Sequence, residues 1–168
     1  MKDEAKSELT KIIGDYDGKL AETERLDALK RAAHAAFPER FAAFKTATIR
    51  PALQEIADML NERGHEASVR EQEESSSAVG GVKSAAVSLR IVPKPFAHKS
   101  IEPNSTTIEI TFSANRAERK ITVSATNTMM SHGGSVGKRG EYDIDVMTAD
   151  VVSGHVIQTL ADAFGGPR

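Results

Sequence analysis

The amino-acid sequence predicts an α+β fold. N-terminal helices precede an antiparallel meander of four or five strands, and a C-terminal helix packs on one face of the sheet. Two observations predict this class. Apolar residues recur every three or four positions up to residue 63, and from residue 65 they alternate with polar residues. The helical spacing returns after residue 148. We therefore place a helical region at residues 1–64 and the sheet with its helix at residues 65–168, and expect them to form one compact domain.

Composition restricts the classes of protein. The chain has 168 residues, with 22 basic and 24 acidic side chains and no cysteine. This length suits one domain with a core of its own. The lack of cysteine excludes disulfides, thiol catalysis and cysteine-ligated metals. The charged beginning of the chain does not resemble a signal peptide, and no apolar run is long enough to span a bilayer. We expect a cytoplasmic protein that has no contact with a membrane.

The N-terminal region is expected to hold several helices. Leu9, Ile12 and Ile13 share one face of a short first helix, which Gly14 with Asp15 and Asp17 can end. A nearly continuous apolar stripe then runs over residues 26–60. The phenylalanine-bearing helices either pack on the sheet or form a helical arm. A stripe longer than the sheet can cover favours dimerisation through helices.

Two prolines interrupt the stripe. Pro38 and Pro51 each lack the N–H of an i→i−4 hydrogen bond, so each marks a kink or the first turn of a new helix. Thr46 or Thr48 is a candidate cap for a helix that has Pro51 near its start. Gly64 is a suitable residue for the position just after the last helical turn.

Short runs of alternating apolar residues predict the strands. They lie around residues 67–69, 87–91, 108–112, 121–125 and 142–146. The polar stretch 71–81 is predicted to be a hairpin loop. Thr148 is the expected N-cap of a final helix that ends near Phe164.

The net charge of −2 conceals a pattern along the chain. Residues 81–140 carry nine basic and three acidic side chains, whereas residues 65–80 and 141–168 carry net charges of −3 and −4. Charge of one sign in one part of a chain is an argument about partners. If the acidic flanks fold over the basic strands, the charges neutralise one another; otherwise an anionic partner is expected.

The most distinctive segment is a glycine-rich basic loop that is predicted to join the last two strands. Glycine permits a close approach of the backbone to a ligand, and successive N–H groups can bind an anion. The spacing of a P-loop is absent. The segment is therefore either an ordinary flexible loop or a ligand site. The candidate ligand-binding residues are Ser131, His132, Gly133, Gly134, Ser135, Gly137, Lys138 and Arg139.

Catalysis is a third option, and it would need His132 or the carboxylates of Glu141, Asp143 and Asp145 to converge in a concave pocket. The five histidines make no metal-binding pair at helical spacing, and we predict neither a metal nor a cofactor. We expect binding rather than catalysis.

The segment from Thr128 to Tyr142, with its Thr-Met-Met, Gly-Gly-Ser and Arg-Gly-Glu-Tyr runs, resembles a family of small bacterial proteins with no assigned function. Ile49-Arg50-Pro51 and residues 60–65 resemble its other recurring stretch. The resemblance implies a bacterial, cytosolic protein and carries over no activity or catalytic residue.

Together these observations predict a non-enzymatic binding or assembly module. Its helical region contacts another protein or a second copy, and the glycine-rich basic loop forms a second contact. The alternative is a module that binds a phosphate-bearing ligand, a nucleotide or a nucleic acid, at Lys138 and Arg139.

Overall fold

The computed structural model describes residues 3–76, 81–97, 106–128 and 135–165. The chain divides into two compact units, Met1–Phe37 and Pro38–Arg168. The described part of the first unit is helical and belongs to α1 (Asp3–Phe44). The second unit holds the end of α1, a sheet and two further α-helices. The predicted α+β class is confirmed.

The second unit is built on a five-stranded antiparallel sheet. Its strands in spatial order are β1 (Glu66–Gln72), β4 (Ala86–Val92), β5 (Ile108–Asn115), β6 (Lys120–Asn127) and β7 (Ser135–Asp143). The order confirms the predicted meander. Every second side chain of β5 is buried, because successive side chains of a strand point to opposite faces.

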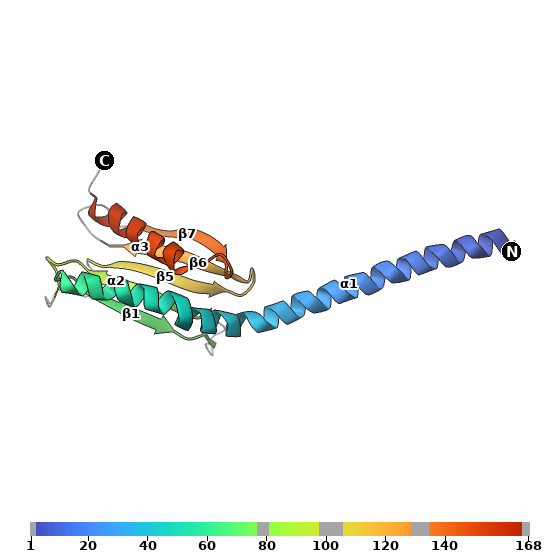
Figure 1. Cartoon of the computed structure of the whole chain (residues 1–168), viewed down its shortest axis with the longest axis horizontal. Coiled ribbons are helices and arrows are strands. Elements are labelled where there is room, and N and C mark those ends of the chain that lie inside the picture. Colours follow the sequence, from blue (N-terminus) through green and yellow to red (C-terminus); the bar gives the residue numbers. More distant parts are fainter. Residues whose placement is uncertain (1–2, 77–80, 98–105, 129–134, 166–168) are drawn as a thin grey trace. The chain divides into compact units, whose positions relative to one another are not determined.

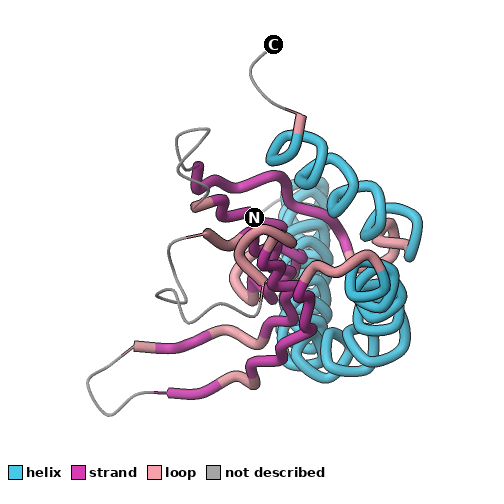
Figure 2. Tube along the Cα trace, turned by 90° about the vertical axis from the view of Figure 1, so that its left-hand side faces the viewer, coloured by secondary structure: helices cyan, strands magenta, loops and turns pink. Residues whose placement is uncertain are grey.

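Part of the stretch predicted to be a hairpin loop forms a small ladder. β2 (Ser75–Ser76) and β3 (Val82–Lys83) pair with each other in antiparallel fashion and make a separate two-stranded sheet. This ladder extends away from the main sheet (Figure 2).

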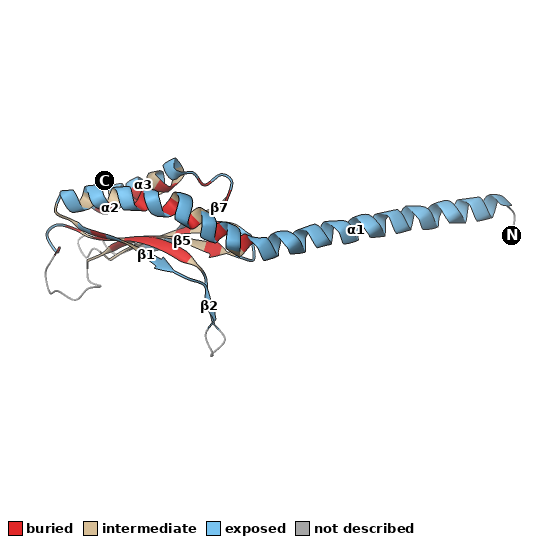
Figure 3. Ribbon diagram, turned by 60° about the horizontal axis from the view of Figure 1, so that its bottom comes forward, coloured by how far each residue is buried: buried red, intermediate tan, exposed pale blue. Residues whose placement is uncertain are grey.

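Two helices cover one face of the main sheet (Figures 1 and 2). They are α2 (Arg50–Glu62) and α3 (Ala149–Phe164). Buried residues gather where these helices face the strands (Figure 3). They include Leu53, Leu89, Phe112, Val152 and Val156. The Thr148 side chain caps α3 as predicted, since it accepts a hydrogen bond from the Val151 N–H at 3.3 Å.

The prediction that a first helix ends at Gly14 is wrong. α1 continues through Gly14 and Gly18, and residues 3–36 are all exposed. A glycine lowers helix stability by about 1 kcal/mol but remains compatible with helical backbone angles. The helix therefore continues through both glycines, because residues that favour a helix precede and follow them.

The two prolines behave differently. Pro38 lies inside α1, whereas Pro51 stands in the first turn of α2, as one of the predicted alternatives required. A π-helical segment, η1 (Lys45–Ile49), joins the two helices. The predicted caps at Thr46 and Thr48 are wrong, because the backbone before α2 is already helical and leaves no chain break for a side chain to cap.

The boundaries of the fifth strand also differ from the prediction. β7 covers Ser135–Asp143, and residues 144–146 form a turn. The alternation of Tyr142, Ile144 and Val146 is therefore not a strand pattern. Pairing along the whole of β6 extends β7 toward its N-terminus, into the segment that its glycines had marked as a loop.

Candidate functional site

The predicted ligand-binding segment lies partly in a strand. Ser131, His132, Gly133 and Gly134 lie outside the described residues. Ser135, Gly137, Lys138 and Arg139 belong to β7, an edge strand of the sheet, and this corrects the predicted loop.

A β-bulge separates the two cations of this segment. Val123 pairs with Gly140 and Ser124 pairs with Lys138, so Arg139 is the extra residue opposite β6. An extra residue bends the strand and redirects its side chains. Lys138 and Arg139 therefore do not form one cationic site.

Each of these two cationic side chains forms an ion pair with a carboxylate. The Lys138 Nζ lies 2.8 Å from Glu141 Oε1, on the face of the sheet opposite α2 and α3. The Arg139 Nη1 lies 2.7 Å from Asp162 Oδ2, which belongs to α3. The Lys138 ammonium and the Asn115 amide hold the pKa of Glu141 below its ordinary value. An anionic ligand would have to compete with a carboxylate at both positions.

Tyr142 and His155 form a polar contact between β7 and α3. The His155 Nε2 and the Tyr142 hydroxyl share a hydrogen bond of 2.9 Å, and the His155 ring also meets Phe112 edge-on. Gly140 makes room for this arrangement, because a Cβ there would lie 2.7 Å from the Tyr142 ring. Burial, and then the charge of Arg139, lower the pKa of His155.

This lowered pKa predicts a pH-dependent contribution to stability. The unfolded chain takes up a proton at His155 more readily than the folded chain does, so the contribution is present above about pH 6.5 and falls as the pH drops below it. We expect the free energy of unfolding of the wild type, relative to His155→Gln, to decrease between pH 8 and pH 5. Urea titrations of both proteins at several pH values measure this difference. Because the other groups titrate in both proteins, their contributions cancel in the difference. A constant difference would contradict the prediction.

The uncovered face of the sheet carries a row of hydroxyls. Cross-strand pairing aligns Arg70, Ser88, Thr111, Ser124 and Lys138, which places a cation on each edge strand and three hydroxyls between them. Arg70 was not among the predicted site residues, although its place directly after the apolar Val69 of a predicted strand was a signal for this face.

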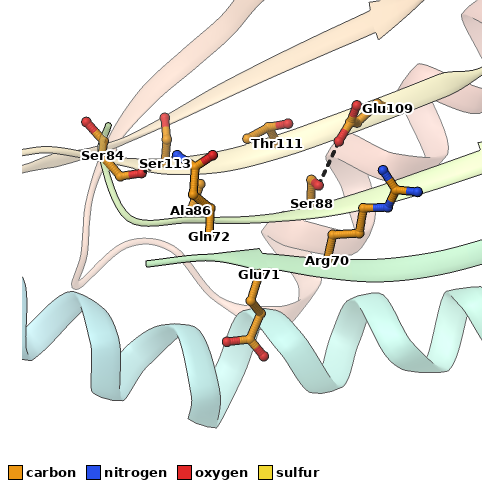
Figure 4. Close-up of a pocket in the computed structure, with 9 residues that line it drawn as sticks. All are labelled: Arg70, Glu71, Gln72, Ser84, Ala86, Ser88, Glu109, Thr111 and Ser113. Atoms are coloured by element: carbon orange, nitrogen blue, oxygen red, sulfur yellow. Dashed lines mark hydrogen bonds between the residues drawn. The ribbon is translucent and has the colours of Figure 1, made fainter. Parts of the chain in front are cut away.

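A groove of about 420 Å³ lies beside Arg70 (Figure 4). Ala86 and Ser88 are its small residues on β4, and Thr111 and Ser113 line it from β5. The Ser88 hydroxyl donates a hydrogen bond of 2.8 Å to Glu109 Oε1. The face therefore combines hydroxyls with charges of both signs and is not a basic surface.

The acidic flanks neutralise part of the basic segment. Arg116 Nη1 lies 2.6 Å from Glu74 Oε1, and Arg139 pairs with Asp162. Both carboxylates come from the flanks that the charge pattern identified. This arrangement corresponds to the neutralised alternative at these two arginines.

The first unit presents an exposed apolar row. We define the α1 row as Leu9, Ile12, Ile13, Tyr16 and Leu20. Their exposed fractions lie between 46% and 64%. Helical spacing places these side chains along roughly 16 Å of one helix face. Contiguous exposed apolar surface of this kind marks an interaction site.

Comparisons with protein-family models, curated proteins and solved structures found no match to the chain. Among the described residues, no helix is both long and apolar enough to cross a membrane. The same part of the chain holds no group of three or more His, Cys, Asp or Glu side chains that could hold a metal ion.

Proposed function

We propose that this chain is a non-enzymatic binding or assembly module that associates with a second copy of itself through the α1 row. One observation carries this proposal: five large apolar side chains lie exposed on one face of a helix whose residues 3–36 are all exposed. An exposed helix keeps its structure more readily when its apolar face is covered by a partner. The resemblance to small bacterial proteins fits a bacterial, cytoplasmic origin.

The charges around the row predict how association depends on salt. Residues 3–24 carry seven acidic and three basic side chains, a net charge of −4. Two copies therefore repel one another while their apolar rows attract. Because salt screens exposed charges, association is expected to strengthen as the ionic strength rises.

The proposal is tested by replacing Ile13 and Leu20 with glutamate in the full chain. We expect the wild type to sediment as a dimer or larger oligomer at micromolar concentration, and the double variant to associate at least tenfold more weakly. Ala21→Glu with Ala28→Glu adds the same charge to α1 away from the row and is expected to leave association nearly unchanged. Analytical ultracentrifugation compares the three proteins, with circular dichroism as the control for helicity.

A wild type that stays monomeric at several hundred micromolar would overturn self-association. Equal weakening by both pairs of substitutions would show that charge, and not the row, controls it.

The alternative is a phosphate-bearing ligand, and Arg70 is the observation that favours it. This arginine lies beside the groove on the uncovered sheet face, and it holds no ion pair among the described residues. Arginine can bind a phosphate through two parallel hydrogen bonds. The alternative has less support at the predicted loop, since Lys138 and Arg139 each already hold a carboxylate.

A further inference from the structure

We infer that the groove between α2 and α3 is a docking site for a basic amphipathic helix of another protein. α2 and α3 lie side by side over the sheet, and a hollow of about 500 Å³ is lined by residues of both helices. A second hollow of about 840 Å³ is lined by α3 and by Gly165. The hollows share Ile157 and Leu160 as lining residues. We call the smaller hollow, which both helices line, the α2–α3 groove.

Five of the nine residues that line this groove are apolar. α2 contributes Ile56, Met59 and Leu60, and α3 contributes Ile157 and Leu160. Met59 is 55% exposed and Ile157 is 65% exposed, although both lie where helices cover a core. Methionine adapts its shape to different partners. A helix laid in a groove between two helices is a recurring mode of peptide recognition, in which apolar side chains at helical spacing enter the groove.

The rim of the groove is acidic. α2 and α3 together carry five acidic side chains and one basic side chain, a net charge of −4, and one of the five, Asp162, is paired with Arg139 of β7. Glu55 and Asp150 line the groove itself and form no ion pair among the described residues, and Arg63 is the basic residue of the lining. Opposite charges around an apolar contact select the partner and accelerate its encounter. The groove therefore fits a helix whose apolar face is flanked by lysine or arginine.

The same charges favour a basic helix over a second copy of this chain as the occupant. The segment around the α1 row, residues 3–24, has a net charge of −4, equal to that of the two helices that form the groove. Like charges placed opposite one another oppose association. The inference is thus independent of self-association through α1, and the two contacts have opposite salt dependence.

The test uses two synthetic peptides of about 15 residues, long enough to form a helix. Both have leucine along one face; one has lysine on both flanks, and the other has glutamate at the same positions. We expect the lysine peptide to bind the full chain with micromolar affinity, at least tenfold more tightly than the glutamate peptide. Added salt is expected to weaken its binding, and NMR shift changes are expected to centre on α2 and α3.

Substitutions in the groove locate the site. Met59→Ser with Ile157→Ser removes two exposed apolar side chains and is expected to weaken the binding of the lysine peptide by at least tenfold. Val82→Ser with Val136→Ser is the matched control, since these valines are also exposed but lie on β3 and β7. All four residues are exposed, so we expect both variants to fold.

Three results would overturn the inference. They are equal binding of the two peptides, equal weakening by the groove and control variants, and NMR shifts confined to other elements. A further result would identify a different occupant: if Met59→Ser with Ile157→Ser abolishes self-association of the chain, the groove holds a second copy and not another protein.

Discussion

Replacing both Glu71 and Glu73 with glutamine is expected to lower the free energy of unfolding of the second unit by about 3 kcal/mol. The reason is Lys45, whose side chain is only 3% exposed. Its Nζ lies 3.1 Å from Glu71 Oε2 and 2.6 Å from Glu73 Oε1. Without these carboxylates the structure would hold a buried charge that nothing opposes. This expected loss of stability is at the low end of the range for breaking a buried ion pair, because Glu73 is largely exposed.

The protonation of Lys45 follows from the same contacts. Burial alone would lower the pKa of its ammonium, but the hydrogen bonds to Glu73 and Glu71, together with the negative charges of these carboxylates, raise the pKa above its ordinary value. Lys45 therefore stays charged at neutral pH. Lys45 is the first residue of η1, the segment between α1 and α2. Its ion pairs therefore link this segment to the end of β1 and to Glu73, the residue that follows β1.

Two further variants separate this explanation from a general loss of charge. Adding Lys45→Met to the double variant removes the unpaired charge and is expected to restore most of the stability, since a buried pair can be replaced by an apolar residue at little cost. Glu74→Gln breaks the more exposed pair with Arg116 and is expected to cost less than about 1 kcal/mol. Urea titration followed through the NMR signals of β4 measures all four proteins. A double variant as stable as the wild type would contradict the prediction.

Replacing Gly14 and Gly18 with alanine is expected to stabilise α1 by about 1 kcal/mol at each position. An added Cβ meets no atom within 4 Å at either glycine, so the gain in helix propensity carries no steric cost. Hydrogen exchange of the α1 amides measures the effect and is expected to slow by at least tenfold in the double variant. Gly154→Ala is the matched control, since its Cβ also meets open space but belongs to α3. Unchanged exchange in α1 would show that helix propensity does not limit its stability.

The regular elements with strong periodicity were predictable from the sequence. The alternation of Ile108, Ile110 and Phe112 identified β5, and the alternation of Ile121 and Val123 identified β6. Thr148 identified the start of α3, because a side-chain cap is a local interaction. Local signals failed where two of them conflicted. Gly14, Asp15 and Asp17 predicted a helix end, whereas the apolar spacing on both sides of them favoured a continuing helix, and the helix continues.

The candidate site was less predictable, because it depends on residues far apart in sequence. The spacing of its glycines separates the glycine-rich segment from a P-loop, but the pairing of β7 with β6 requires a partner strand that local patterns do not show. The bulge at Arg139 sends neighbouring cations to carboxylates of different elements, and no spacing rule predicts this. The exposed apolar positions 9, 12 and 13 were visible as a helix face, whereas their exposure was not.

The sequence by itself determined the α+β class, the order of the strands and the placement of the charge segments. Periodicity and charge are local properties, so a single chain displays them before it folds. Only the tertiary structure decided which apolar faces stay uncovered and which charges pair. Packing determines which apolar faces are covered, because α2 and α3 cover the sheet while the α1 row and the α2–α3 groove remain exposed. Strand register determines which charges pair, because it brings residues from distant parts of the chain within reach of one another.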